Sequence, residues 1–117
     1  MSDLTILHHS ACSTSRHALD EASGAGVDAQ VIAYLKNPLS REELLELIGE
    51  LEDPPADLVR KDGFFRAQGL DPDDYVTPEA VAGLLVDHPR LMQRPVLVRG
   101  GRAIIGRPKD RVASFLA

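Results

Sequence analysis

Hydrophobic positions in the first third of the chain predict a strand, a helix and a second strand. Residues 4–7 form a short apolar run typical of a buried strand. A helical pattern begins at about Ser13, and Gly24 and Gly26 favour its end. A second apolar run over residues 27–34 predicts another strand. A strand–helix–strand unit of this length joins parallel strands, so we expect these two to run parallel.

The middle of the chain has a helical period. Ser40–Glu43 forms a capping box, and apolar residues follow at helical spacing until Pro54–Pro55 ends the helix. A short helix is expected over residues 56–61. Thr77–Pro78 predicts the start of a further helix, which His88–Pro89 ends.

The last section returns to strands. Two apolar runs, residues 96–98 and 103–105, flank Gly100–Gly101, which is a hairpin signal. A final helix is expected from about Lys109. The complete order is β-α-β, a helical block, and β-β-α. We therefore predict an α/β protein with a mixed four-stranded sheet and helices around it.

Length and composition agree with this fold class. The chain has 117 residues, 44% of them hydrophobic and 26% charged, so we expect one domain over residues 1–117 with the helical block at about 38–90. The net charge of −5 argues against nucleic acid as a partner, because phosphate contacts need clustered Lys and Arg. It leaves room for a small anion site, where a few local cations outweigh distant acidic groups.

The sequence also limits the compartment. The first residues have neither the basic start nor the apolar run of a signal peptide, and no apolar stretch is long enough to cross a bilayer. One cysteine cannot form an internal disulfide. We therefore expect a cytoplasmic protein with no membrane partner. One cysteine without a spaced ligand pair also predicts no zinc site.

Cys12 is the main candidate for chemistry, because it stands between a predicted strand end and a predicted helix start. Free backbone N–H groups and the helix dipole favour an anion there, which lowers a thiol pKa and forms the nucleophilic thiolate. A lone cysteine is more often a small buried hydrophobe, but this position favours the functional interpretation. Ser13–Ser15 add hydroxyl donors, of which at least one is expected to cap the helix. His8, near the strand end, could support the thiolate.

Three arginines beside turns or chain breaks are candidate anion ligands. Arg60 is expected at the end of the short helix, whereas Arg94 and Arg107 each precede a proline on either side of the C-terminal hairpin. A single arginine is usually only a solvated cation. Spacing alone does not show that the three converge on Cys12.

Several segments together resemble the ArsC-type, glutaredoxin-linked arsenate reductases over nearly the whole chain. The stretch Leu4–Arg16 resembles the nucleophile loop of that family, although His9 and Ser10 stand where Asn and Pro are usual and Ser13 where Gly is common. The other similar segments, in the family's order, are Tyr34–Pro38, Leu58–Lys61, His88–Pro89, Arg94–Pro95 and Gly106–Pro108.

The resemblance implies a thioredoxin-like fold with the helical block as an insertion. It implies that Cys12 is the attacking thiolate, His8 an electrostatic aid and Ser15 a support for the thiolate. It also implies that Pro95 is cis and lies opposite the nucleophile. The oxyanion ligands implied by the family are Arg60, Arg94 and Arg107.

The implied function is arsenate reduction through a thiol–arsenate adduct on Cys12. Because Cys12 is the only cysteine, the second thiol must belong to another molecule. Glutathione or another small thiol is therefore the expected co-substrate, and a glutaredoxin the expected partner that clears the mixed disulfide. No bound cofactor is expected.

Two alternatives remain within the same fold. Relatives of the family bind RNA polymerase and regulate transcription, many of them through a Cys-x-x-Cys redox switch. Cys12 is followed by serine at the position of the second cysteine, which disfavours a redox switch but leaves a redox-inactive adaptor open. The other alternative is a thiol reductase with a different substrate. The three arginines argue against it, because a plain disulfide needs no oxyanion ligands.

Overall fold

The computed structural model describes residues 4–116, and its centre is a mixed sheet of four strands in the order β2-β1-β3-β4. The strands are β1 (Leu4–His8), β2 (Ala29–Ala33), β3 (Val96–Arg99) and β4 (Arg102–Ile105). β1 pairs in parallel with β2 and antiparallel with β3, and β3 and β4 form a hairpin. The predicted fold class, the parallel pair and the hairpin are confirmed.

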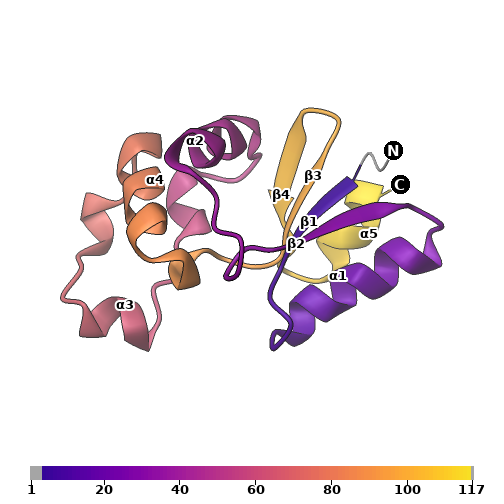
Figure 1. Ribbon diagram of the computed structural model, residues 1–117, viewed down its shortest axis with the longest axis horizontal. Coiled ribbons are helices and arrows are strands. Elements are labelled where there is room, and N and C mark those ends of the chain that lie inside the picture. The colour runs from indigo at the N-terminus through magenta and orange to yellow at the C-terminus, as the bar shows by residue number, and fades with distance from the viewer. Residues whose placement is uncertain (1–3, 117) are drawn as a thin grey trace.

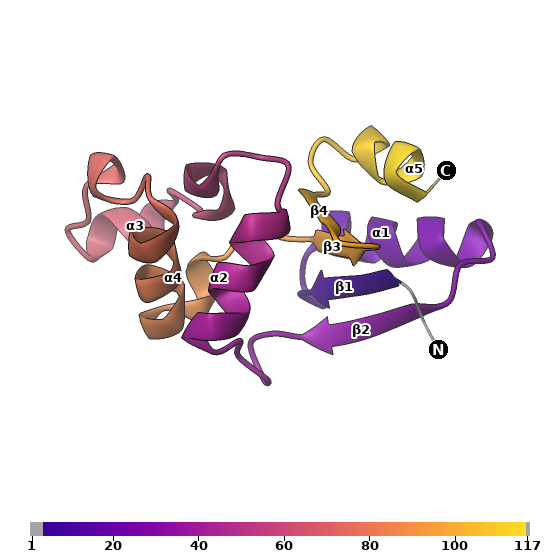
Figure 2. The same ribbon diagram turned by 90° about the horizontal axis from the view of Figure 1, so that it is seen from above.

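Two helices cover one face of this sheet (Figures 1 and 2). They are α1 (Ser13–Gly24), which connects β1 to β2, and α5 (Asp110–Leu116), which ends the described chain. Their inward side chains pack with residues from three strands. That cluster contains Leu4, Ile6, Ala18, Ala22, Leu97, Ile104, Val112, Phe115 and Leu116.

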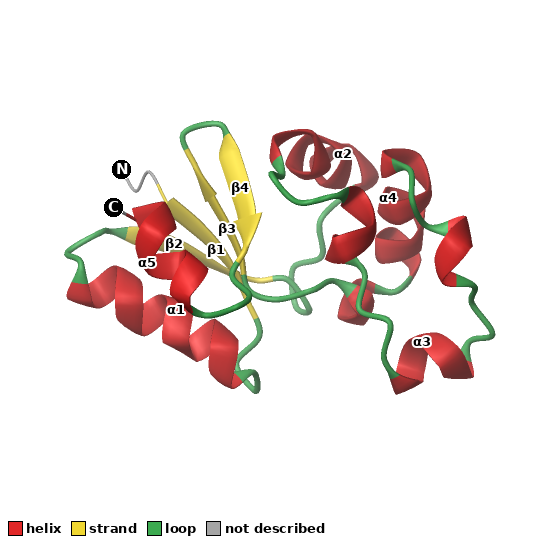
Figure 3. Cartoon of the chain, turned by 180° about the vertical axis from the view of Figure 1, so that it is seen from behind, coloured by secondary structure: helices red, strands yellow, loops and turns green. Residues whose placement is uncertain are grey.

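The helical block between β2 and β3 lies beside the sheet, so the molecule is elongated, with extents of 43 × 26 × 24 Å (Figure 3). Its α-helices are α2 (Arg41–Glu50), α3 (Gly63–Ala67) and α4 (Pro78–Asp87). Its 3₁₀ turns are η1 (Pro55–Leu58), η2 (Pro72–Asp74) and η3 (Pro89–Leu91).

The predicted starts of α2 and α4 are confirmed by their caps. The Ser40 hydroxyl accepts a hydrogen bond from the Glu43 N–H at 3.1 Å, and the Glu43 carboxylate accepts one from the Ser40 N–H at 3.0 Å. The Thr77 hydroxyl likewise accepts from the Ala80 N–H at 3.2 Å, with Pro78 as the first helical residue. These bonds satisfy N–H groups that have no partner inside their helix.

The helix predicted over residues 56–61 is confirmed only in its first half, as the 3₁₀ turn η1, and does not continue to residue 61. The chain forms η1 and then an extended stretch in which Val59 pairs with Met92 as an isolated bridge. The next helix starts only at α3, because the Asp62 side chain caps it by accepting from the Phe65 N–H at 3.1 Å. Arg60 therefore lies in the extended stretch instead of at a helix end, and its N–H donates to the Leu91 carbonyl at 2.7 Å.

The second strand also differs from its prediction. It covers five residues, and Val31, expected at its apolar centre, is 46% exposed. The reason is the topology, because β2 is an edge strand and its residues are covered less completely than those of β1.

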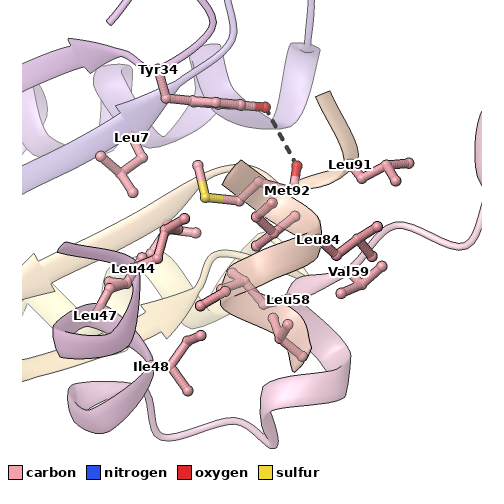
Figure 4. Packing of buried hydrophobic residues seen from close by; sticks show 14 of the residues in the cluster. Leu7, Tyr34, Leu44, Leu47, Ile48, Leu58, Val59, Leu84, Leu91 and Met92 are labelled. Carbon is pink, nitrogen blue, oxygen red and sulfur yellow. Dashed lines mark hydrogen bonds between the residues drawn. The ribbon is translucent and has the colours of Figure 1, made fainter. Parts of the chain in front are cut away.

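A larger core joins the helical block to the other face of the sheet (Figure 4). Leu7, Val96 and Ile105 contribute from the strands, and Leu44, Leu58 and Leu84 are among those from the block. Residues adjacent in a strand thus enter different cores, since successive side chains point to opposite faces. Within residues 4–116, no helix combines the length and apolarity that a membrane span needs.

Candidate active site

Cys12 occupies the turn between β1 and α1. Its backbone is extended, with φ −98° and ψ 119°, and its carbonyl accepts the first helical hydrogen bond, from the Arg16 N–H at 3.1 Å. Its own N–H donates to the His9 carbonyl at 3.0 Å. The cysteine is thus the N-cap of α1, between the strand end and the helix start predicted from the sequence, and only 9% of it is exposed. The cap expected from a hydroxyl of Ser13–Ser15 is wrong, because no side-chain hydrogen bond from the described residues caps this start of α1.

The surroundings of this sulfur favour its ionised form. Burial alone would raise the pKa of the Cys12 thiol, but the backbone N–H groups of Ser15 and Thr14, a hydrogen bond from Arg94 and the positive charge of Arg107 outweigh it. The result is a pKa lowered from 9.0 to about 7. The thiolate is therefore far more populated near neutral pH than it is for an ordinary cysteine.

The side chain of Arg107 contacts the sulfur directly. Its Nη2 lies 3.2 Å from the Cys12 Sγ, and its Nε donates to the Arg94 carbonyl at 2.7 Å. The two hydrogen bonds fix the guanidinium plane between the nucleophile and the loop before β3. Arg94, on that loop, is half-buried, and its Nε is buried without a hydrogen-bond partner within residues 4–116.

The loop that carries Arg94 packs tightly against the one that carries Arg107. The Arg94–Pro95 bond is cis, the isomer implied by the family resemblance, and Arg107–Pro108 is cis as well. The Gly106 N–H donates to the Pro95 carbonyl at 2.8 Å. A Cβ on Gly106 would lie 2.8 Å from Pro95 Cγ, which explains why glycine stands there.

Arg60 lies in a cleft of ≈ 490 Å³ that extends from Arg94 toward the helical block. The cleft is lined by His9, Leu35, Arg60, Asp62, Arg90 and Arg94. The Arg60 Nε is 3.8 Å from an oxygen of Asp62, and the Arg90 guanidinium lies 4.0 Å above the Phe64 ring. The fold thus brings Arg94 and Arg107 to the sulfur, with Arg60 beside Arg94 in the adjoining cleft. Arg90 was not among the residues singled out in the sequence.

The other predicted residues lie close to this turn. Ser15 is fully buried, and its hydroxyl accepts from the His9 N–H at 3.3 Å, which holds the turn together. His8 ends β1, and its Nδ1 is buried without a partner in the described chain. Burial, and then the charge of Arg16, lowers the pKa of His8, so its imidazole is neutral at pH 7.

Two further residues of the site, besides Arg90, were missed by the sequence analysis. His9 lines the cleft; its Nδ1 accepts from the Ala11 N–H at 3.2 Å, and burial followed by the charge of Arg94 lowers its pKa. Tyr34 is 1% exposed and donates from its hydroxyl to the Met92 carbonyl at 3.4 Å (Figure 4). Burial raises the pKa of Tyr34 despite a hydrogen bond from Arg94, so the phenol stays neutral. The only sequence signal for Tyr34 was its place in the family-like segment Tyr34–Pro38.

Together these groups form a nucleophile beside an anion-binding surface. A thiolate that receives hydrogen bonds from two arginines can approach an anion that would otherwise repel it, because the guanidinium groups offset both negative charges. Within residues 4–116, no group of three His, Cys, Asp or Glu side chains is placed to hold a metal ion.

Known proteins are similar to this chain in sequence and in fold. The ArsC family matches residues 7–115. An arsenate reductase of Acidiphilium multivorum is 35% identical over 99% of this chain and 82% of its own length. The uncharacterized protein YfgD of Escherichia coli K12 is 36% identical over 95% of this chain and 94% of its own. The structure of an arsenate reductase from Vibrio cholerae superposes with a TM-score of 0.84, at 31% identity and 95% coverage of both chains. The chain therefore belongs to the ArsC family and has its thioredoxin-like fold.

Proposed function

We propose that this protein is an arsenate reductase that uses Cys12 as its nucleophile and an external thiol as its reductant. The observation that carries the proposal is the contact of Arg107 with a sulfur whose pKa is lowered to about 7. The relatives named arsenate reductase, similar over almost the entire chain, support arsenate as the anion.

Arsenate is a tetrahedral oxyanion, and arginine suits it because the planar guanidinium donates two parallel hydrogen bonds. Arg94 and Arg107 already bind each other and the sulfur, so an oxyanion on them is within reach of Cys12. The buried Nε of Arg94 is a further donor without a protein partner among the described residues. Arg60 adds positive charge from the cleft. Ser15 supports the thiolate through its backbone N–H and the turn through its hydroxyl. His8 lies at the end of β1 beside this turn, and as a neutral imidazole it would aid the site by hydrogen bonding instead of by charge.

The reaction begins when the Cys12 thiolate attacks arsenic. An S–As bond forms, and one arsenate oxygen leaves as water after taking up protons, which is covalent catalysis. The sulfur of a second thiol then attacks the Cys12 sulfur. An S–S bond forms, the S–As bond breaks, and its electron pair stays on arsenic, which leaves as arsenite. Two thiols have been oxidised to one disulfide, and arsenic has gained two electrons.

The second thiol must come from outside these 117 residues, because Cys12 is their only cysteine. Glutathione is the abundant thiol of matching chemistry, and a glutaredoxin would reduce the mixed disulfide on Cys12 by thiol–disulfide exchange. A thiolate nucleophile that must return to its reduced form also favours a cytoplasmic location.

The test is NADPH consumption with arsenate, glutathione, glutaredoxin and glutathione reductase, with Cys12→Ser in parallel. We expect turnover by the wild type and none above background by Cys12→Ser, because a serine hydroxyl is not ionised at neutral pH. Equal rates for both proteins would remove Cys12 from the mechanism. Arg94→Ala should raise the arsenate KM, and an unchanged KM would remove Arg94 from the anion site.

The same assays separate the alternatives. A thiol reductase of other substrates would consume NADPH with a glutathione mixed disulfide and remain inactive with arsenate. A redox-inactive adaptor would show no turnover in either assay and would retain RNA polymerase subunits in a pull-down. The lowered pKa of Cys12 favours the enzyme, because an adaptor has no use for a thiolate.

A further inference from the structure

An ion pair joins the end of the helical block to α5. Asp53 follows α2, and Arg111 lies in the first turns of α5, yet the Arg111 Nη1 and the Asp53 Oδ1 are 2.8 Å apart. Their side chains are 32% and 16% exposed, respectively. An ion pair this well covered is screened less by solvent than a surface pair, so its geometry is better defined.

The two residues of this ion pair also hydrogen-bond the backbone at Ile105 and Arg107. The second Asp53 oxygen accepts from the Ile105 N–H at 3.0 Å. The Arg111 Nη1 also donates to the Ile105 carbonyl at 3.0 Å and to the Arg107 carbonyl at 3.3 Å. One carboxylate and one guanidinium therefore hold the backbone at Ile105, the end of β4, and at Arg107, two residues further on.

The side chain of Arg107 is fixed separately, by its bonds to the Arg94 carbonyl and the Cys12 sulfur. A long side chain keeps such a position only while its own backbone stays in place, since rotamer freedom otherwise competes with the two bonds. We propose that Arg111 and Asp53 are positioning residues. They hold the backbone of Arg107 in place, so that the Arg107 guanidinium keeps its hydrogen bond to the Cys12 sulfur. The inference rests on the proposed function, because it assigns these two residues to the same site.

A neighbouring ion pair provides the matched control. Glu52, next to Asp53, connects the same end of the helical block to Arg102 in β4, with Arg102 Nε and Nη2 at 2.6 and 3.1 Å from the two Glu52 oxygens. That pair lies on the surface, and its hydrogen bonds do not involve the segment from Ile105 to Arg107. A general loosening between α2 and β4 would follow from losing either pair. Displacement of Arg107 should follow only from losing Asp53 or Arg111.

The first test is the pH dependence of Cys12 alkylation by iodoacetamide, which needs no arsenate. Arg111→Ala should shift the alkylation midpoint upward by about 0.5 pH units, because a displaced Arg107 stabilises the thiolate less. Asp53→Asn keeps the side-chain shape and an oxygen that can accept from the Ile105 N–H. This variant should shift the alkylation midpoint upward as well, but by less than Arg111→Ala. Arg111→Lys, which can still pair with Asp53, should fall between Arg111→Ala and the wild type, and Arg102→Ala should have the wild-type midpoint.

The second test is the arsenate KM, which we expect to rise about threefold in Arg111→Ala, with a smaller change in kcat and no change in Arg102→Ala. The inference is overturned if folded Arg111→Ala matches Arg102→Ala in both readouts. If Arg111→Ala does not fold, Asp53→Asn decides: an upward midpoint supports the inference and a wild-type midpoint overturns it. If the wild type does not reduce arsenate, the proposed function fails, while the alkylation midpoints still decide this inference.

Discussion

At the scale of single residues, the site divides into a part that the sequence predicts and a part that it does not. The backbone N–H groups of Thr14 and Ser15 can hydrogen-bond the sulfur because Cys12 is the N-cap of a helix. The start of that helix is predicted by the pattern of apolar positions. Arg94 and Arg107 lie far along the chain from Cys12. Their convergence depends on the pairing of β3 with β1 and on the tight contact of Gly106 with Pro95, which no local pattern encodes.

The ionisation of Cys12 should make folding stability depend on pH. The folded pKa is lowered from 9.0 to about 7, so between these values the unfolded thiol holds a proton that the folded protein has lost. The free energy of unfolding therefore rises with pH across this window. The contribution is complete above pH 9 and is lost as the pH falls through 7.

Urea unfolding at about pH 6, 7, 8 and 9 measures this pH dependence of the unfolding free energy. Cys12→Ser is the control, because it removes this titration and keeps every other group. The difference in unfolding free energy between wild type and variant should grow from pH 7 to pH 9. A difference that stays constant would mean that the thiol pKa is the same in both states.

Arg107 and Arg60 should have separable effects. Arg107 touches the sulfur and is among the main groups that lower the Cys12 pKa, whereas Arg60 lies in the adjoining cleft. Arg107→Ala should raise both the thiol pKa and the arsenate KM, the latter by about tenfold for a lost charge-assisted bond. Arg60→Ala should raise the KM and leave the alkylation midpoint near 7. Identical behaviour of the two variants would contradict this division.

At the scale of elements, the sequence predicts best where a local signal decides the structure. The caps at Ser40 and Thr77 and the hairpin at Gly100–Gly101 are local, and the structure agrees with all three. The helix predicted over residues 56–61 ends early, after Leu58, because the bridge from Val59 to Met92 takes the backbone out of a helix. That bridge is a contact between distant segments, so no local pattern could have indicated it.

Gly106 should be the glycine whose replacement disturbs the site most. An alanine Cβ there would lie 2.8 Å from Pro95, 3.1 Å from Leu97 and 3.2 Å from Val112, all buried. Gly106→Ala should therefore lower the free energy of unfolding by about 1–3 kcal/mol, as overpacking does. The arsenate KM should rise as well, since the neighbouring Arg107 must shift.

The matched control is Gly49→Ala in α2, where an added Cβ meets nothing within 4 Å. Alanine should stabilise the helix there by about 0.5–1 kcal/mol, because glycine loses more backbone freedom on folding. Urea unfolding of both variants measures the two changes. Gly106→Ala as stable as the wild type would show that the loops at Pro95 and Gly106 are loosely packed.

At the scale of the whole molecule, the two cores share the same strands. In β3, Val96 belongs to the core of the helical block and Leu97 to the core under α1 and α5, and in β4 Ile105 and Ile104 divide in the same way. Neither core can lose its strands without exposing the other. The site depends on this arrangement, because Cys12 comes from the α1 side and Arg60 from the helical block.

The chain should therefore unfold in one cooperative step, as the single domain predicted from the sequence requires. Leu58→Ala empties a fully buried position in the block, and Val112→Ala one under α5. Each should lower the unfolding midpoint by the same amount whether it is followed by far-UV circular dichroism or by NMR methyl signals from either core. The expected loss of unfolding free energy is about 2–5 kcal/mol for Leu58→Ala and less for Val112→Ala.

The control is Val86→Ala, at a site 41% exposed, which should change the unfolding midpoint little. Two transitions, or a variant that shifts only its own core, would show that the helical block folds separately and that the position of Arg60 relative to Cys12 is not fixed by a shared core.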